Sequence, residues 1–276
     1  MALRINYNLA SSAAQRGLGA SQDAYAKQAN RLSTGLRINS ASDDAAGMAV
    51  SEKLKNQVRG LNQAQRNAQD GISLIQTAEG GLAETHNILS RMRELAVQAA
   101  SDTLSNSDRA NLEAEFTQLK AEVTRIATTV NFNGTLLLNN ASSDTLTLQI
   151  GANNGSTLTV ALSNNNATGL AINTAAMASV TSLAVAATTI TSIDAAISTV
   201  STNRANLGAM QNRLESVGRS LAVASENTAA ANSRVADADI AESMSELVRA
   251  QILQQAGISV LAQANQAPSL VLQLLR

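Results

Sequence analysis

The chain has 276 residues, and its 20 Lys plus Arg against 21 Asp plus Glu give a formal net charge of -1. This balance excludes the clustered positive charge on which nucleic-acid and anionic-membrane binding depend. Cys is absent and His86 is the single histidine, so disulfides, thiolate chemistry and histidine metal sites are excluded, and we predict neither an enzyme nor a cofactor.

The apolar residues predict closely packed helices. They make up 45% of the chain, while aromatic residues make up 1%, so burial comes in many small increments from Ala, Leu, Val and Ile. We find no run of the roughly 20 apolar residues that span a bilayer, and the first residues lack the apolar stretch of a secretory signal. We therefore expect no membrane span and, if the protein is exported, a route without a cleaved signal.

The first part of the chain has a helical pattern. Steps of four and three residues from Leu54 to Leu89 meet eight apolar residues in eleven positions, and a second run from Leu112 to Val130 is apolar at every such position. Ser105 and Asp108 fit a capping box at the start of this second run. The pattern predicts two antiparallel helices with a turn near Asp102.

The length of the first helix predicts an elongated molecule. A helix from Ser42 to Ala99 would be roughly 87 Å long, whereas a compact globule of this chain length is only about 48 Å across. Gly80-Gly81 is a candidate break in that helix. Even with such a break, the remaining piece is about 57 Å long, so we expect a rod.

The middle of the chain is almost uncharged. Between Arg125 and Arg204 there is no Lys or Arg, and the acids there are Asp144 and Asp194. Apolar and polar residues alternate on both sides of Asn154-Gly155, which is the strongest short hairpin signal. We predict a β-hairpin over residues 145–162 that packs on the helices by one face.

A helical pattern resumes at Ile190 and continues through an Ala-rich stripe to Leu261. Pro268 is the single proline of the chain, and we expect it to interrupt the last helix because proline lacks a backbone N–H.

Three features have a structural and a functional interpretation. Asp43-Asp44 fits a cation site less well than the first turn of a helix that opens at Ser42. His86 lies at a packing position and has no nucleophile to activate. Glycines within the first long helix cost about 1 kcal/mol each relative to Ala. This cost favours close packing of helices against them, within the subunit or between subunits, with plain breaks as the alternative at Gly80-Gly81.

Both ends of the chain are amphipathic helices with few large side chains. Such helices do not offset their own ordering entropy. We infer that residues 1–35 and 236–276 need each other and also copies of themselves on neighbouring chains, although a simple intramolecular helix pair is the alternative.

Both ends of the chain carry long, recognisable motifs. Toward the N-terminus these are residues 32–47 (LSTGLRINSASDDAAG), 70–73 (DGIS), 91–98 (RMRELAVQ) and 132–134 (FNG). Toward the C-terminus they are residues 204–213 (RANLGAMQNR) and 249–266 (RAQILQQAGISVLAQANQ) and the closing Leu-Leu-Arg276. Together these segments resemble bacterial flagellin. The match covers roughly residues 1–138 and 204–276 in the same order, with a short middle segment that implies a filament without large outer domains.

The resemblance implies a mainly α fold, a long antiparallel, coiled-coil-like helical rod with a small β-hairpin. It implies an inner filament tube of residues 1–35 and 236–276 and an outer tube of residues 36–235. Carried over by motif, Arg91, Leu95 and Glu115 are candidates for subunit contact and for contact with an innate immune receptor of animals. The expected assembly residues of the terminal helices are Ile5, Leu9, Leu32, Ile252, Ile258, Leu261, Leu274 and Leu275.

The predicted function is that of a structural subunit that self-assembles into the bacterial flagellar filament and transmits torque as thrust. Head-to-tail association that does not close gives an open helix instead of a ring. The implied partners are further copies, a C-terminal export chaperone, the flagellar export apparatus, the filament cap and the hook-junction proteins. The alternatives are a hook-filament junction protein and a signalling coiled coil.

Overall fold

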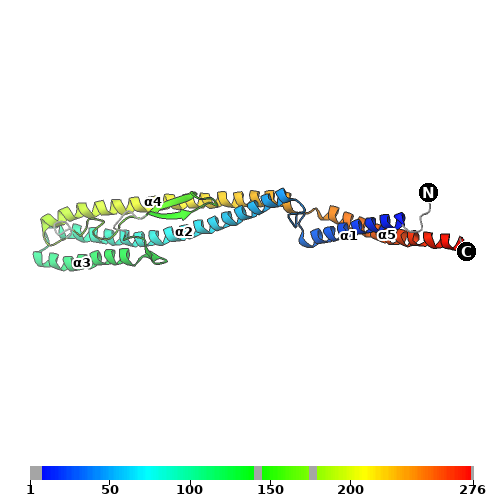
Figure 1. Ribbon diagram of the computed structural model, residues 1–276. Helices are drawn as coiled ribbons and strands as arrows, with labels where there is room; N and C mark the ends of the chain where they lie inside the picture. The colour runs from blue at the N-terminus through cyan, green and yellow to red at the C-terminus, as the bar shows by residue number, and fades with distance from the viewer. Residues whose placement is uncertain (1–7, 140–144, 174–178, 275–276) are drawn as a thin grey trace. The chain divides into compact units, whose positions relative to one another are not determined.

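The computed structural model describes residues 8–139, 145–173 and 179–274, with side chains of the last helix described as far as Gln266. Helices dominate these residues, as Figure 1 shows. In chain order the elements are α1 (Leu9–Thr34), α2 (Ala45–Ala99), α3 (Asn106–Thr129), β1 (Asn131–Phe132), β2 (Thr135–Leu136), β3 (Thr145–Gln149), β4 (Thr157–Ala161), α4 (Leu183–Ala236) and α5 (Ile240–Leu274). The predicted mainly α fold with a small β element is confirmed.

The chain divides into two compact units, residues 1–57 with 227–276 and residues 58–226. We call them the terminal unit and the central unit. In the terminal unit α1 and α5 lie side by side and antiparallel (Figure 1). Leu36 and Asp237 form an antiparallel bridge just beyond the ends of α1 and α4. Gly35 makes this sharp helix end possible, because it has a φ of 69° and donates its N–H to the Arg31 carbonyl.

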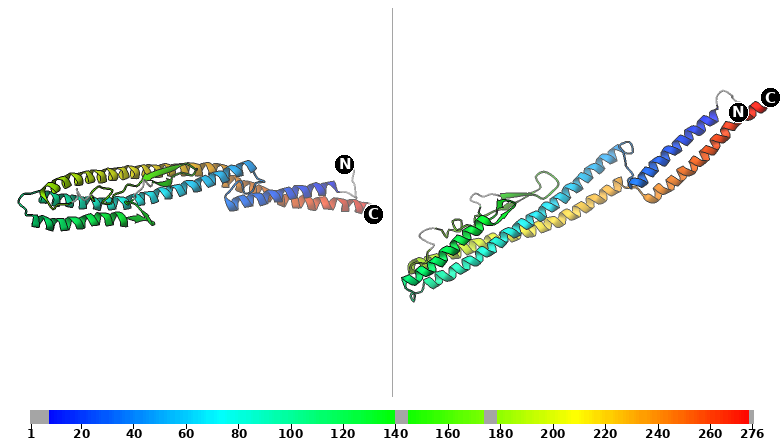
Figure 2. Two further views of the ribbon diagram at one scale, coloured as in Figure 1. Left: turned by 60° about the vertical axis from the view of Figure 1, so that its left-hand side comes forward. Right: turned by 90° about the horizontal axis from the view of Figure 1, so that it is seen from below.

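In the central unit parts of α2 and α4 pack lengthwise with α3, as both views of Figure 2 show. Its main core contains large side chains, and a second, smaller cluster consists of Leu61, Ala64 and Leu221. The large side chains that are almost completely buried include Ile75, Leu82, Leu89, Met92, Phe116, Val123, Ile193 and Leu214. The antiparallel turn predicted near Asp102 and the capping box of Ser105 and Asp108 are both confirmed.

Two β-hairpins follow α3. The predicted one is confirmed as β3 and β4, which pair in an antiparallel register from Thr145 opposite Ala161 to Gln149 opposite Thr157. Leu158 and Val160 turn toward the core and are about 2% exposed or less. The second hairpin, β1 and β2, was not predicted, although the Asn-Gly dipeptide in its turn is a hairpin signal. Asn133 and Gly134 have φ angles of 49° and 82°, which a tight primed turn requires.

Two predicted helix boundaries are wrong, and the alternative of a break within the first long helix is not realised. The long helix begins at Ala45 instead of Ser42, because Asp44 caps it by accepting a hydrogen bond from the Gly47 N–H at 2.8 Å. α2 runs without a break through Gly80-Gly81. α5 likewise runs through Pro268 to Leu274.

Close packing explains four of the five glycines in α2. A Cβ on Gly81 would lie 2.7 Å from Leu138 Cδ1, and one on Gly71 would lie 2.5 Å from Leu148 Cδ1. Gly60 meets Ala152 of the β3–β4 connection in the same way, and Gly47 meets Asp44 and Ile38. Only Gly80 faces open space. Close packing therefore occupies the space at four of these glycines, but hairpins and loops make most of the approach, whereas the prediction was close packing of helices.

One helix of the described residues, α4, contains an 18-residue window apolar enough to cross a membrane by length and composition. The sequence analysis did not identify this stretch. Its Ala, Val, Ile and Thr residues supply core positions of the central unit, among them Ala186, Ile193 and Ala196. Of this window, 28% is buried in the structure, so packing within the subunit covers part of the stretch.

Candidate assembly surfaces

The terminal helix pair buries very little of its own side-chain surface. α1 has no buried residue, and α5 buries only Ser243 and Ala250 among its described side chains. Where Gly257 of α5 faces Leu18 of α1, only one of the two partners has a side chain. Most apolar surface of the pair is therefore left uncovered within the subunit.

The uncovered apolar residues of α5 lie on more than one side. Ile240, Met244, Val248 and Ile252 recur every four residues and wind slowly around the helix. Leu253 and Val260 lie on a different side, because each residue turns by about 100°. The large apolar side chains of α5 that are between 46% and 60% exposed are Ile240, Met244, Val248, Ile252, Leu253, Ile258 and Val260. Helices that are apolar all round are normally buried.

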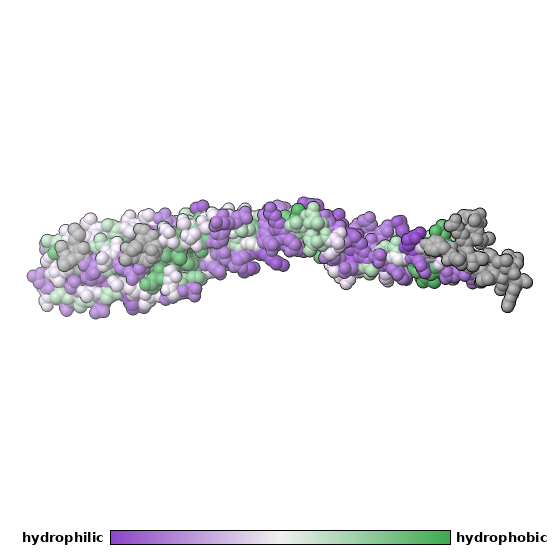
Figure 3. All heavy atoms as spheres, viewed as in Figure 1, coloured by the Kyte–Doolittle hydropathy of each residue, from purple (hydrophilic) through white to green (hydrophobic). Residues whose placement is uncertain are grey.

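The predicted terminal assembly residues fall into three groups. Leu9, Ile252 and Ile258 are exposed, at 67%, 60% and 54%. Leu32 and Leu261 are half-buried. The described side chains do not include Ile5, Leu274 and Leu275. On the face drawn in Figure 3, hydrophobic atoms of the pair lie among hydrophilic ones next to the grey residues.

A second candidate surface, which is polar, lies where α2 and α3 meet in the central unit. The Arg91 guanidinium donates from Nε to Glu115 Oε1 at 2.9 Å and from Nη1 to Glu94 Oε2 at 2.9 Å. Hydrogen bonds to Glu94 and then Glu115 raise the pKa of Arg91 above its usual range. The Arg91 side chain is still 51% exposed, so two of the three predicted contact residues meet on an accessible surface.

Leu95, the third of these residues, lies beneath that surface. It is 1% exposed and belongs to the core of the central unit. Its side chain therefore contacts the interior of the subunit, one helical turn beyond Arg91.

Arg109 is a buried cation that the sequence analysis missed. It is 6% exposed, and its guanidinium donates to the carbonyls of Ala99 and Ser101, both at 2.8 Å. Ala99 is the last residue of α2, where helix carbonyls lack donors and carry partial negative charge. A cation in the first turn of its own helix, α3, is unfavourable. The unfavourable position of this cation in α3 was the signal in the sequence that Arg109 binds the carbonyl end of another helix.

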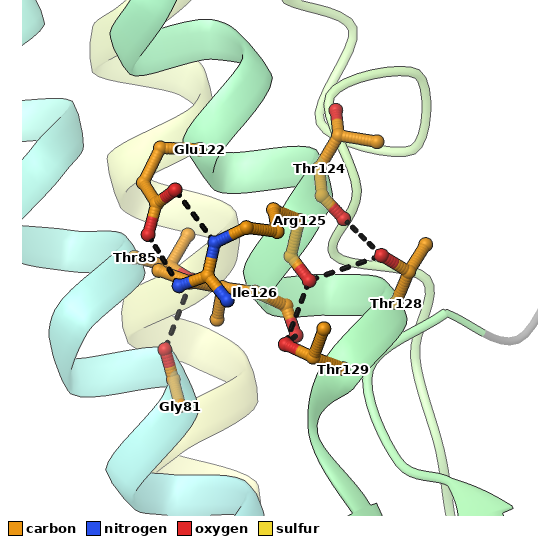
Figure 4. Close-up of polar contacts among 8 residues, drawn as sticks. All are labelled: Gly81, Thr85, Glu122, Thr124, Arg125, Ile126, Thr128 and Thr129. Carbon is orange, nitrogen blue, oxygen red and sulfur yellow. Dashed lines mark hydrogen bonds and ion pairs between the residues drawn. The ribbon is translucent and has the colours of Figure 1, made fainter.

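The threonine-rich helix surface near the end of α3 satisfies its hydroxyl groups locally. Figure 4 shows Thr128 and Thr129 donating to the carbonyls of Thr124 and Arg125 at 3.0 and 2.8 Å, and Thr85 of α2 donating to Gly81 at 2.9 Å. Such bonds to the preceding turn leave the hydroxyls without need of an outside partner. This part of the surface is polar with few charges.

The Asp, Glu and His side chains that the structure describes do not gather in one place. Among the residues that the structure describes, no group of three or more His, Asp and Glu is placed to hold a metal ion. Asp43, expected in the first helical turn, instead lies before α2 and pairs with Lys27 Nζ at 2.7 Å. This hydrogen bond lowers the pKa of Asp43 to about 2. The arrangement fits mechanical connection between helices better than catalysis.

The sequence and the structure of this chain are similar to those of known proteins. Residues 5–143 match the bacterial flagellin N-terminal helical region, and residues 190–275 match the bacterial flagellin C-terminal helical region. A flagellin of Halalkalibacterium halodurans is 50% identical over 272 residues, which cover 99% of both chains. A flagellin of Bacillus subtilis is 43% identical over 304 residues, covering 99% of this chain and 100% of that chain. The crystal structure of Bacillus cereus flagellin is similar with a TM-score of 0.50 and 34% identity, over 56% of this chain and 88% of that chain.

Proposed function

The chain belongs to the bacterial flagellin family and is a structural subunit of the flagellar filament, and from this premise we propose that residues 1–35 and 236–276 form the inner tube of that filament and residues 36–235 its outer tube. Helix ends support this division, since α1 ends at Thr34 and α4 at Ala236. A boundary there keeps α1 and α5 together as one assembly element.

The uncovered apolar surface of α5 carries the proposal. Two helices that touch along one line cover only one side of each other, and α5 is apolar on further sides. Covering those sides requires more helices of the same kind, and a homopolymer supplies them from neighbouring copies. Because the contact joins different surfaces of successive copies, it continues as an open helix.

Deletion of residues 236–276 tests the division. We expect the truncated chain to remain soluble, because the central unit keeps its own core, and to form no filaments when seeded with sheared wild-type filaments. Negative-stain electron microscopy and sedimentation measure the outcome. Filaments formed by the truncated chain alone would overturn the proposal.

Point variants locate the assembly energy more sharply. Ile252→Ser with Ile258→Ser removes two exposed apolar side chains, while Gln251→Ser with Gln255→Ser changes exposed polar neighbours on the same helix. Burying the rest of each isoleucine in a neighbour is worth about 1–2 kcal/mol, so we expect the isoleucine pair to raise the critical concentration by about 30-fold or more. The glutamine pair should change it by less than about threefold. Equal effects of the two pairs would contradict a role for the apolar surface.

The surface of Arg91 and Glu115 is proposed as a second contact between subunits and as the contact for an animal innate immune receptor. Its exposure and its fixed guanidinium support this role, with Leu95 acting from below. Titration of purified monomer with the receptor ectodomain, compared with Arg91→Ala and with Arg125→Ala as a matched exposed arginine of an ion pair on α3, tests it. Absence of binding by the unchanged monomer would refute the receptor contact.

The remaining proposed partners concern export and placement. By family resemblance they are a C-terminal export chaperone, the flagellar export apparatus, the filament cap and the hook-junction proteins, and export proceeds without a cleaved signal peptide. The apolar α5 supports a chaperone, because such a helix needs cover before assembly. Mass spectrometry of the exported chain, which should retain its first residues, tests the export route.

A further inference from the structure

Pro268 creates a specific need within α5. In an α-helix each N–H donates to the carbonyl four residues earlier. α5 runs through Pro268, and proline has no N–H to donate. The carbonyl oxygen of Ala264 therefore lacks its helical donor, and a group outside the helix has to replace it or leave it to water.

Asn8 supplies that replacement from the other terminal helix. Its Nδ2 donates to the Ala264 carbonyl at 2.7 Å, while its Oδ1 accepts the Ser11 N–H at 3.0 Å as the N-cap of α1. Only one orientation of the amide satisfies both partners, because the N–H needs an oxygen and the carbonyl needs a nitrogen. One side chain thus caps α1 and completes α5.

We propose that Asn8 is the residue that sets the register of α1 against α5, through the carbonyl that Pro268 frees. The proposal rests on the terminal pair being the assembly element. Asparagine fits this role because it accepts and donates at once, whereas aspartate only accepts and serine has a shorter reach. The identity of residue 8 is thereby tied to the proline at 268.

The rest of the seam leaves the register weakly specified. α1 has no buried residue, and α5 buries only the small side chains of Ser243 and Ala250 among those described, so no large buried side chain locks the seam. Polar contacts fix both ends instead. At one end the Arg37 N–H donates to the Ala236 carbonyl at 2.7 Å and the Ala238 N–H to the Gly35 carbonyl at 2.9 Å. Asn8 fixes the other end.

The two ends agree on one antiparallel register. Asn8 precedes Leu36 by 28 residues, and Asp237 precedes Ala264 by 27 residues. A second contact lies beside the first, where Ser11 Oγ donates to Asn265 Oδ1 at 2.9 Å. It involves no orphaned carbonyl and serves as a matched control.

A double-mutant cycle tests the link between Asn8 and Pro268. Asn8→Ser keeps a good N-cap and removes the amide donor, while Pro268→Ala returns an N–H to the Ala264 carbonyl. We expect Asn8→Ser to raise the critical concentration for filament growth about five- to tenfold in the chain that keeps Pro268, as loss of one hydrogen bond predicts. In the Pro268→Ala background the same change should raise it no more than about twofold. Equal effects in both backgrounds would overturn the proposal.

Ser11→Ala is the control, and its effect should be the same with Pro268 and in the Pro268→Ala background. If the unchanged chain forms no filaments, the proposed function fails. The register proposal can still be tested on the unassembled subunits of the unchanged chain, the two single variants and the double variant. Amide hydrogen exchange in the first turn of α1 should accelerate about five- to tenfold in Asn8→Ser with Pro268 and no more than about twofold in the Pro268→Ala background. Equal acceleration in both backgrounds would overturn it.

Discussion

The terminal and central units are built from the same few types of apolar residue, but they differ in how much of that apolar surface they bury. In the central unit three helical segments and the β3–β4 hairpin surround one core, so that Ile75, Leu82 and Phe116 are about 1% exposed or less. In the terminal unit α1 has no buried residue, and Ile252 stays 60% exposed. The difference comes from the number of elements that enclose the apolar side chains. Two helices alone cannot enclose a core.

The comparison separates folding from assembly. The central unit buries its large side chains within one subunit and needs no neighbour to do so. On the assignment proposed above, the terminal unit keeps its apolar surface for other copies, and ordering its long helices is unfavourable until that surface is covered. A filament subunit gains from this division, because the part that drives polymerisation stays incomplete before the subunit arrives.

Phe116→Ala tests the central side of the comparison and should have the largest effect. Phe116 is completely buried in α3, and its truncation leaves a cavity that costs about 3–5 kcal/mol. Chemical unfolding of the subunit followed by circular dichroism measures the loss. A change below about 1 kcal/mol would show that this core does not hold the unit together.

Leu261→Ala is the counterpart in the terminal unit. Leu261 is half-buried in α5, so we expect the subunit to lose less than about 1 kcal/mol while filaments become harder to form. Chemical unfolding of the subunit and the critical concentration for filament growth measure the two effects. The opposite pattern, with a less stable subunit and unchanged polymerisation, would break the comparison.

Local signals in the sequence predicted much of the fold. The 3.5-residue spacing marked α2 and α3, the Ser105 and Asp108 pair marked the start of α3, and Asn154-Gly155 marked the turn region of the β3–β4 hairpin. Each signal depends on residues close together in the chain.

The failures share a different cause. Pro268 does not end α5, because its cost is offset by Asn8, which bonds to a carbonyl 256 positions away in the sequence. Arg109 serves the end of another helix, and Leu95 lies inside although its neighbours Arg91 and Glu94 face outward. Partners distant in the chain decide these outcomes, and single-sequence periodicity does not contain them.

Gly80 and Gly81 offer a smaller test of packing within one helix. The Cβ of Gly80→Ala meets no atom within 4 Å, so this variant should stabilise the subunit by about 1 kcal/mol through helix propensity. Gly81→Ala gains the same propensity but places its Cβ 2.7 Å from Leu138 Cδ1 and 2.9 Å from Val130 Cγ2. We expect the two variants to differ by about 1–3 kcal/mol in unfolding free energy. Equal stabilities would mean that the core shifts freely around Gly81.

The smallest expected effect concerns the ion pair of the terminal unit. The Lys27 side chain holds the pKa of Asp43 at about 2, below its ordinary value of 3.8. Since the folded state lowers this pKa, its contribution to stability is present above about pH 4 and is lost as the pH falls toward 2. Asp43→Asn keeps an oxygen for the Asn39 and Ser40 N–H groups but removes the charge.

Thermal unfolding of both chains between pH 2 and 7 measures this contribution. The unfolding midpoint of the unchanged chain should exceed that of Asp43→Asn above about pH 4, and the two should converge near pH 2. The difference should also shrink in high salt, because the Lys27 side chain is 49% exposed. A constant difference across this pH range would show that the loop before α2 is held by its neutral hydrogen bonds, and that the terminal unit does not use charge in place of a core.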